Sequence, residues 1–381
     1  MKNALLLGAA LACVAAVVTS ANQSGVPPGL ILEGKRFFES ETFGGNGRTC
    51  QTCHSAGTGT VSPEDAQKRF VQNPGDPLFL HDGSDDGLGG GSSRMRADAT
   101  VLVTIPLAAN VSLVDYPLAR TVTVRRAIAT TLNSPALDEQ IMLDGRQPSL
   151  EAQAAGAIAD HAQGVPPSAA AAHAIAAFQK SNAFFTSPEL RRFALENGPA
   201  PGLPQGQTAS EKRGRRFFED VPPDPTDGFK PGLCAHCHSG PLLNKTNEFA
   251  QFFIGLPIPA GQRFMNVGVS EFNAAGNTVY KFVFNKGTPQ EAVIESPDLG
   301  RAMVTGQLEQ PLPILDQVNS FKISPLRGIS RTAPYFHDNS AKTLEAVAAH
   351  YALFFNVVTA GTIVLTPGDQ ADIVAYMKLL K

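Results

Sequence analysis

The stretch Cys50-Gln-Thr-Cys-His54 decides the fold of this 381-residue chain, and Cys234-Ala-His-Cys-His238 repeats it in the other half. The pattern C-x-x-C-H is the attachment signature of c-type haem. On a helical turn, residues i and i+3 lie on one face, so the two thiols can reach the two vinyl groups of one porphyrin. The following histidine can then bind the iron as its proximal ligand. We therefore predict two covalent haem c groups, held by Cys50, Cys53 and His54 and by Cys234, Cys237 and His238.

The alternative is a pair of C-x-x-C motifs that are redox-active or bind zinc. A thioredoxin-like motif needs no histidine directly after it, and a zinc site would join the two cysteine pairs without that requirement. Haem attachment explains both histidines, so it is the preferred reading.

The composition excludes some classes of partner. Acidic side chains number 34 and basic ones 31, so the sequence shows no positive field for nucleic acid. The length is sufficient for two domains with a sizeable core. With four cysteines assigned to haem, we expect no disulfide.

The N-terminus is typical of an export signal. Lys2 precedes an apolar run over residues 4–18, and small residues follow up to Ala21. The run is shorter than the roughly 20 residues of a membrane span, and no later run is longer, so we predict a protein that does not span the membrane. We expect residues 1–21 to be a signal peptide and the mature chain to be periplasmic. Lipidation at Cys13 is the weaker alternative.

A helix–loop–haem unit occurs twice. Gly34-Lys-Arg-Phe-Phe-Glu39 precedes the first motif and Gly214-Arg-Arg-Phe-Phe-Glu219 precedes the second, which indicates a duplication. Proline and glycine in residues 197–207 are typical of a linker. We predict a mainly α fold with two cytochrome c-like domains, residues 22–200 and 201–381, whose haems face each other across the interface. Their phenylalanines should pack in the core: Phe37, Phe38, Phe217 and Phe218.

Between the motifs the local signals vary. Residues 76–94 carry Asp82, Asp85 and Asp86 among glycines and predict a surface loop, in which His81 is solvated rather than a haem ligand. Strands are expected within residues 101–124 and 252–284. Residues 152–180 predict two helices broken at 164–167, the second capped by Ser168. Residues 369–380 have helical spacing, which places Met377 in the core rather than on a haem.

Three further segments resemble one family in this order around the motifs: RRAIATTLN (125–133), LDGRQPSLEAQAAGAI (143–158) and FKISPLRGISRTAPYFHDNSAKTLEAV (321–347). They are similar to the bacterial di-haem cytochrome c peroxidases, which include the MauG-type enzymes that oxidise a partner protein. The resemblance implies that the N-terminal haem reacts with hydrogen peroxide. It also implies that the C-terminal haem receives electrons from a small periplasmic donor, a cytochrome c or a cupredoxin. A homodimer is common in this family.

The resemblance implies an axial ligand for the second haem. The peroxidases usually carry methionine fourteen residues after the histidine that corresponds to His337, and here that position is Tyr351, as in the MauG-type pattern. The neighbouring alternative is His350. One residue on a helix is a rotation of about 100°, so only one of the two can face the haem. Met265 and Met303 are outside candidates.

The chain departs from the family pattern at the inter-haem relay and in the distal pocket. Leu143 replaces the relay tryptophan, and the chain has no Trp, so electrons would pass through Tyr335 or by direct tunnelling. The distal glutamate position is Gln163, which cannot take a proton but can donate a hydrogen bond to a bound oxygen species. His161 is the candidate base, since imidazole titrates near neutral pH. The alternative for His161 is a solvent-facing side chain at a helix end.

The family also implies a calcium ion between the domains, with carbonyls of Thr332 and Pro334 as ligands and Ala127 in place of an asparagine. Arg327 is predicted to pair with a haem propionate. His173 and His236 are expected on a surface helix and at a variable motif position. Three functions follow: a peroxidase, a MauG-like oxidase of a partner protein, and an electron carrier with two six-coordinate irons.

Overall fold

The computed structural model describes residues 26–252, 258–273, 276–308 and 317–381. The predicted signal peptide and Cys13 lie outside these residues. In the first half the helices are α1 Pro28–Ser40, α2 Cys50–Cys53, α3 Pro63–Gln72, α4 Ser93–Asp98, α5 Ser134–Leu137, α6 Leu150–Asp160, α7 Ala169–Gln179 and α8 Pro188–Glu196. In the second half they are α9 Ala209–Arg215, α10 Val269–Phe272, α11 Arg301–Thr305, α12 Leu344–Val358 and α13 Pro367–Met377.

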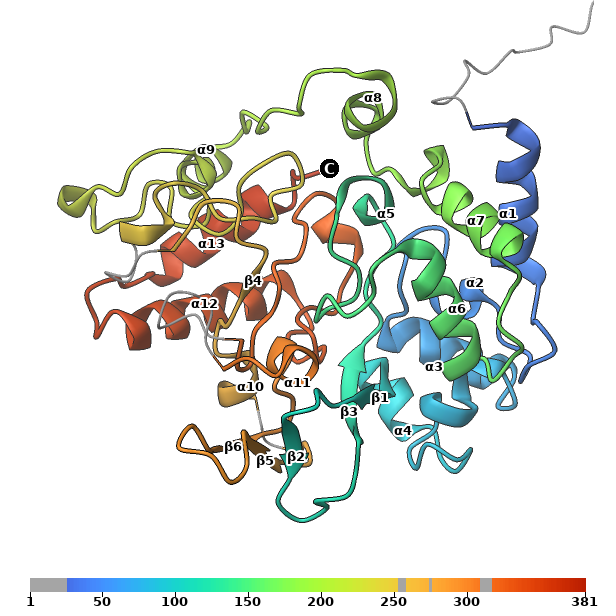
Figure 1. The fold of residues 1–381 in the computed structure, drawn as a ribbon. Helices are drawn as coiled ribbons and strands as arrows, with labels where there is room; N and C mark the ends of the chain where they lie inside the picture. The colour runs from blue at the N-terminus through green and yellow to red at the C-terminus, as the bar shows by residue number, and fades with distance from the viewer. Residues whose placement is uncertain (1–25, 253–257, 274–275, 309–316) are drawn as a thin grey trace, which may run out of the picture.

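The strands are short and form three small antiparallel sheets in the described part of the chain. They are β1 Thr100–Pro106, β2 Val111–Leu113, β3 Thr121–Ala127, β4 Phe264–Met265, β5 Tyr280–Phe284, β6 Ala292–Ser296 and β7 Phe321–Lys322. Helices α1, α6 and α7 gather on one side of the molecule and α9, α12 and α13 on the other (Figure 1). Strands β1 and β3 lie between them. The prediction of a helix-rich fold with some strands is confirmed.

The duplicated unit packs in the same way in both halves. Helix α1 crosses α7 so closely that a Cβ on Gly34 would lie 1.9 Å from the carbonyl oxygen of Ala174. Helix α9 crosses α13 in the same manner, and a Cβ on Gly214 would lie 2.0 Å from the carbonyl oxygen of Asp372. Only glycine allows this backbone contact. The repeated glycine therefore fixes where α1 crosses α7 and where α9 crosses α13.

Aromatic side chains complete the two repeats. Phe38 packs with its ring centroid 5.5 Å from that of Phe178 and 5.6 Å from that of Phe184. Phe218 lies 5.2 Å from Tyr376 by the same measure. Edge-to-face and tilted contacts of this kind are typical of aromatic cores. The predicted core positions are confirmed: Phe38, Phe217 and Phe218 are buried, and Phe37 is half-buried.

Part of the second half completes the core of the first. Strand β2 pairs with β5, with Val111 opposite Phe284. Phe282, Phe284 and Met303 are fully buried in the same hydrophobic cluster as Ile105. Residues 280–305 therefore pack with the N-terminal half. The linker at residues 197–208, between α8 and α9, contains neither helix nor strand. The division into domains at residue 200 stays a prediction, and residues 280–305 follow that division in the chain but pack with the half that precedes it.

A buried cluster of charged side chains joins the N-terminal half to residues of the C-terminal half. Arg126 on β3 donates from Nη1 to Asp144 at 2.5 Å and from Nε to Asp298 at 2.7 Å, and all three side chains are buried. Asp144 belongs to the Leu-Asp-Gly-Arg motif, and Asp298 lies in the segment that crosses from the second half. Because each buried charge is paired, breaking the cluster by removing one partner should be strongly destabilising.

The other local predictions agree with the structure with one exception. Helices α6 and α7 are separate, and the Ser168 hydroxyl caps α7 by accepting from the Ala171 amide. The loop over residues 76–94 is not wholly a surface loop, because Asp82 is buried. Among the described residues, no helix is long and apolar enough to cross a membrane.

Candidate haem sites

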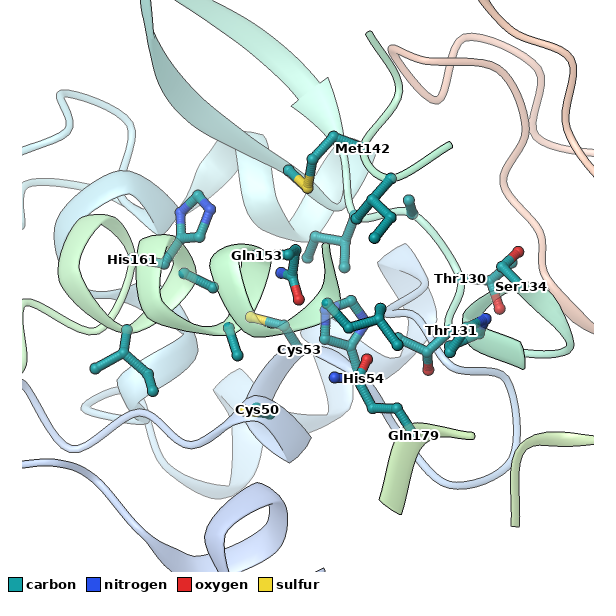
Figure 2. A pocket seen from close by; sticks show the side chains of 18 of the residues that line it. Cys50, Cys53, His54, Thr130, Thr131, Ser134, Met142, Gln153, His161 and Gln179 are labelled. Atoms are coloured by element: carbon teal, nitrogen blue, oxygen red, sulfur yellow. The ribbon is translucent and has the colours of Figure 1, made fainter. Parts of the chain in front are cut away.

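The first C-x-x-C-H motif lies on the wall of a large cavity. The cavity has an empty volume of about 1460 Å³, open solvent included. Cys50, Cys53 and His54 come from α2 and its C-terminal end, and Gln153 and His161 come from α6 on another wall (Figure 2). The segment after β3 closes a further side, at Thr130, Thr131 and Ser134.

The second motif has a cavity of its own, with an empty volume of about 1750 Å³. Cys234, Cys237 and His238 line it, and Tyr351 on α12 lines it as well. Phe218 of the second repeat borders this cavity, as Phe38 of the first repeat borders the other. The duplication therefore extends from the helices to the cavities.

Both motif histidines are held in the same way. The Nδ1 atom of His54 lies 2.8 Å from the carbonyl oxygen of Gly59, and Nδ1 of His238 lies 2.8 Å from that of Leu243. A carbonyl only accepts, so Nδ1 carries the proton and Nε2 keeps its lone pair for a metal. Burial lowers the pKa of both imidazoles, that of His238 to about 4. Both rings are therefore neutral at neutral pH, as metal ligation requires.

The thiols are not activated in the way that redox-active cysteines are. The four are unpaired in the structure. Burial raises the pKa of Cys50 and Cys237 to about 12 and raises those of Cys53 and Cys234 as well. Reactive cysteines have lowered pKa values instead. Within the described residues, no three His, Cys, Asp or Glu side chains group to hold a metal ion. Two thiols and one neutral imidazole on each cavity wall fit haem c, and the zinc alternative is not supported.

His161 is tied into a buried ion pair. Its Nδ1 lies 2.5 Å from Oδ2 of Asp82, and Arg48 donates to the other carboxylate oxygen. Burial alone would raise the pKa of Asp82, but the hydrogen bonds from His161 and Arg48 and the charge of Arg48 lower it below its usual value. His161 is therefore neither free nor simply solvent-facing. Asp82 was missed in the sequence because it comes from a glycine-rich loop 79 residues before its partner.

The expectation for Gln163 is not met. Its side chain is exposed, and its Oε1 accepts from Nδ2 of Asn46 at 3.2 Å, away from the cavity. The glutamines that line the cavity are Gln140, Gln153 and Gln179. Gln153 lies on α6 two helical turns before His161, the residue that caps the C-terminal end of this helix, so both lie on one face. Helical spacing from His161 is thus the signal that could have found Gln153.

On α12, Tyr351 rather than His350 borders the second cavity. His350 is turned away, with Nε2 2.8 Å from the carbonyl oxygen of Val267 and its ring 4.5 Å from that of Phe336. Burial raises the pKa of the Tyr351 phenol, and the neighbouring thiols act in the same direction. Met265 and Met377 also line this cavity, whereas Met303 lies in the core of the first half.

The two cavities share one wall. Leu143, at the position of the expected relay, lines both. Tyr335 lines the second cavity and not the first, and its hydroxyl donates to the carbonyl of Ile329 at 3.0 Å. The shared wall is formed by Ala127, Ile128, Ala129, Thr130, Ser134, Leu143 and Lys322.

Arg327 does not have the predicted role. Its guanidinium donates to the carbonyls of Pro201, Gly202 and Pro241 at 2.7–3.2 Å, and it lines neither cavity. It holds the linker instead. The basic side chain that lines both cavities is Lys322, whose Nζ lies 2.9 Å from the Asp138 carboxylate.

The remaining predictions concern calcium and three histidines. Ala127, Thr332 and Pro334 all border the second cavity, so the structure brings the predicted calcium region together without testing the ion. His173 is exposed, as expected, and His81 borders neither cavity. His236, at a variable position within the second motif, is buried.

Comparisons with known proteins place the fold. No protein-family model matches the chain, and no curated protein matches it. Among solved structures, a MauG-like protein associated with microbial copper homeostasis aligns over 93% of this chain and 90% of its own, at 16% identity and a TM-score of 0.52. The diheme peroxidase BthA from Burkholderia thailandensis aligns over 93% and 86% at 15% identity with a TM-score of 0.47. Kuenenia stuttgartiensis hydrazine synthase aligns over 99% and 98% at 16% identity with a TM-score of 0.45. The chain has the fold of the MauG-like protein, in agreement with the resemblance seen in the sequence.

Proposed function

We propose that this protein is a periplasmic di-haem c-type peroxidase. It reduces hydrogen peroxide to water with electrons from a small redox protein, a cytochrome c or a cupredoxin. The observation that carries the proposal is the difference between the two cavities. The first presents an imidazole backed by a carboxylate, whereas the second presents the phenol of Tyr351. The second cavity also holds the imidazole of His337, so the carboxylate behind His161 is the feature that marks the first site for proton transfer.

In the first cavity the side chains have separate roles. The haem, when bound, supplies the iron that takes up peroxide and the electrons for its reduction. His54 fixes the ring plane through its bond to Gly59 and offers Nε2 to the metal. His161 takes the first proton from peroxide and returns it to the leaving oxygen as water forms. Gln153 lies on the same helix face and offers an amide donor beside it.

In the second cavity, His238 and Tyr351 would hold the iron of a bound haem. A phenolate stabilises ferric iron, so this site should have a lower potential than one with methionine. Electrons enter here and cross the shared wall at Leu143 and residues 127–130 to the first cavity. Residues 22–200 and 201–381 are the proposed haem domains, preceded by a signal peptide at 1–21. A calcium ion on the carbonyls of Thr332 and Pro334 is part of the same proposal.

A second function is favoured by a specific observation. The position fourteen residues after His337 is Tyr351 and not a methionine, its side chain lines the second cavity, and the fold matches a MauG-like protein. Both support an oxidase that uses peroxide to oxidise a partner protein. The absence of tryptophan from the chain weakens this alternative, because charge could not be shared through an aromatic relay at Leu143.

The test uses purified full-length protein. Its mass after denaturation should exceed that of the mature polypeptide by two haems, and replacing Cys234 and Cys237 with alanine should remove one. Optical and electron paramagnetic resonance spectra should show one high-spin haem, and stoichiometric peroxide should change the spectrum of that haem only. Rapid oxidation of a reduced small cytochrome would establish the peroxidase.

Other outcomes have distinct meanings. A long-lived oxidised state with slow turnover would select the protein oxidase. Two low-spin haems that ignore peroxide, both as ferric protein and after addition of one electron, would leave an electron carrier and overturn the proposal.

A further inference from the structure

The ion pair behind His161 is built more firmly than a surface contact. Arg48 and Asp82 are both buried, at 2% and 3% exposure. Besides Asp82, Arg48 donates from Nε to the carbonyl of Pro77 at 2.7 Å and from Nη2 to that of Leu78 at 3.0 Å. A Cβ on Gly83 would lie 2.0 Å from the Leu78 carbonyl oxygen, so the turn after Asp82 has no room for a larger residue. The carboxylate of Asp82 is therefore fixed in place.

The same arginine also holds the backbone of the candidate base. Nη1 of Arg48 donates to the carbonyl oxygen of His161 at 3.0 Å, and Nδ2 of Asn46 donates to it at 3.1 Å. Asn46 and Arg48 lie in the loop just before Cys50, where the first haem attachment begins. The base and the attachment site are thus fastened to one loop, which keeps their separation constant.

We propose that Asp82, held by Arg48, is the positioning residue of the first site: it fixes the tautomer and orientation of His161 so that Nε2 accepts protons from iron-bound ligands. The inference rests on the proposed function, since it assumes that the first cavity admits an external ligand. It goes beyond that function by assigning the group that makes His161 a base.

The proton balance follows from the partners. A carboxylate paired with arginine is ionised and only accepts, so Nδ1 of His161 must carry a hydrogen. The neutral ring then has its lone pair on Nε2. When peroxide or hydrogen cyanide binds, its proton moves to Nε2, and no other bond to the protein changes. The resulting imidazolium already has Asp82 as its counter-ion, which stabilises it.

The alternative is a purely structural role, in which Asp82 only neutralises the charge of Arg48. Cyanide and nitric oxide separate the two roles, because cyanide is mostly protonated at neutral pH and must lose a proton to bind, whereas nitric oxide has none to lose. We would measure the association rates of both ligands with the ferric holoprotein at neutral pH. The variants are Asp82→Asn, His161→Gln and their combination.

We expect Asp82→Asn to slow cyanide association by about 10- to 100-fold, a part of the 10²–10⁴-fold that a positioned base supplies. Nitric oxide association should stay within about twofold, since no proton moves. In the His161→Gln background, Asp82→Asn should have no further effect, because Asp82 acts through His161. If the single Asp82 variant does not fold, Asp82→Asn combined with Arg48→Gln removes both buried charges and should give the same slowing.

Two results would overturn the inference while leaving the proposed function intact. One is unchanged cyanide association in the Asp82 variants. The other is equal slowing of both ligands, which indicates a purely structural role. If neither ligand binds the wild-type protein, in the ferric or the half-reduced state, the inference and the proposed function both fail.

Discussion

Replacing Gly34 with alanine should separate α1 from α7. The added methyl carbon would lie 1.9 Å from the carbonyl oxygen of Ala174 and 2.9 Å from Cβ of Phe178. An ordinary contact needs about 3.5 Å, so the helices must move apart by about 1.5 Å. The nearest obstacle is backbone, which no rotamer change can relieve. Overpacking of this kind costs about 1–3 kcal/mol, and the contact here is tight enough to expect about 3 kcal/mol.

Gly29 supplies the matched control in the same helix. Nothing lies within 4 Å of a Cβ at this position, so Gly29→Ala should gain up to about 1 kcal/mol from helix propensity. We would follow urea unfolding of both holoproteins by circular dichroism at a helical wavelength, since the chain has no tryptophan for fluorescence. Phe38, one turn after Gly34, borders the first cavity, so its displacement should also shift the spectrum of the first haem. Equal midpoints for Gly34→Ala and wild type would refute this account of the packing.

Three further predictions concern the ion cluster and the second cavity. Arg126→Gln leaves Asp144 and Asp298 buried without their cation and should cost about 3–5 kcal/mol in urea unfolding; a loss below about 1 kcal/mol would contradict the pairing. Burial alone would raise the pKa of Asp144, but Arg126 and Arg146 lower it. The ionised Asp144 therefore stabilises wild type above its unfolded pKa of about 3.9, and this stabilisation is lost as pH falls through the folded pKa. Arg126→Gln should therefore lose less stability than wild type on acidification, and parallel curves would count against this. Tyr351→Phe should raise the midpoint potential of the second haem and change its spectrum, whereas His350→Gln should leave both unchanged; the reverse pattern would exchange the two ligand assignments.

Local patterns predicted the parts of the fold that local residues determine. The two C-x-x-C-H motifs and the repeated Gly-x-x-Phe-Phe segments located both cavities and the helices around them, because thiol spacing and helix packing depend on neighbouring residues. The Ser168 cap and the two Ala-rich helices were found for the same reason. The choice of Tyr351 over His350 came from the resemblance, and the geometry of α12 agrees with it.

What the sequence could not supply were partners that meet only through the fold. Asp82 lies in a glycine-rich loop, and nothing local distinguishes it from Asp85 and Asp86, which remain outside the core. Arg327 was assigned to a propionate because it is a buried arginine, yet the backbone carbonyls of Pro201, Gly202 and Pro241 satisfy it. Gln163 failed because counting along a helix does not say where the helix ends, and α6 ends at Asp160.

The pairing of β2 with β5 determines when the hydrophobic core of the first half can be completed during folding. The core around Ile105 and Val111 stays incomplete until Phe282, Phe284 and Met303 have been synthesised. Both C-x-x-C-H motifs precede these residues in the chain. Such distant contacts form late, since loop closure must precede them. We therefore expect both haems to be attached while the chain is still open, with closure of the first core as the final event of maturation.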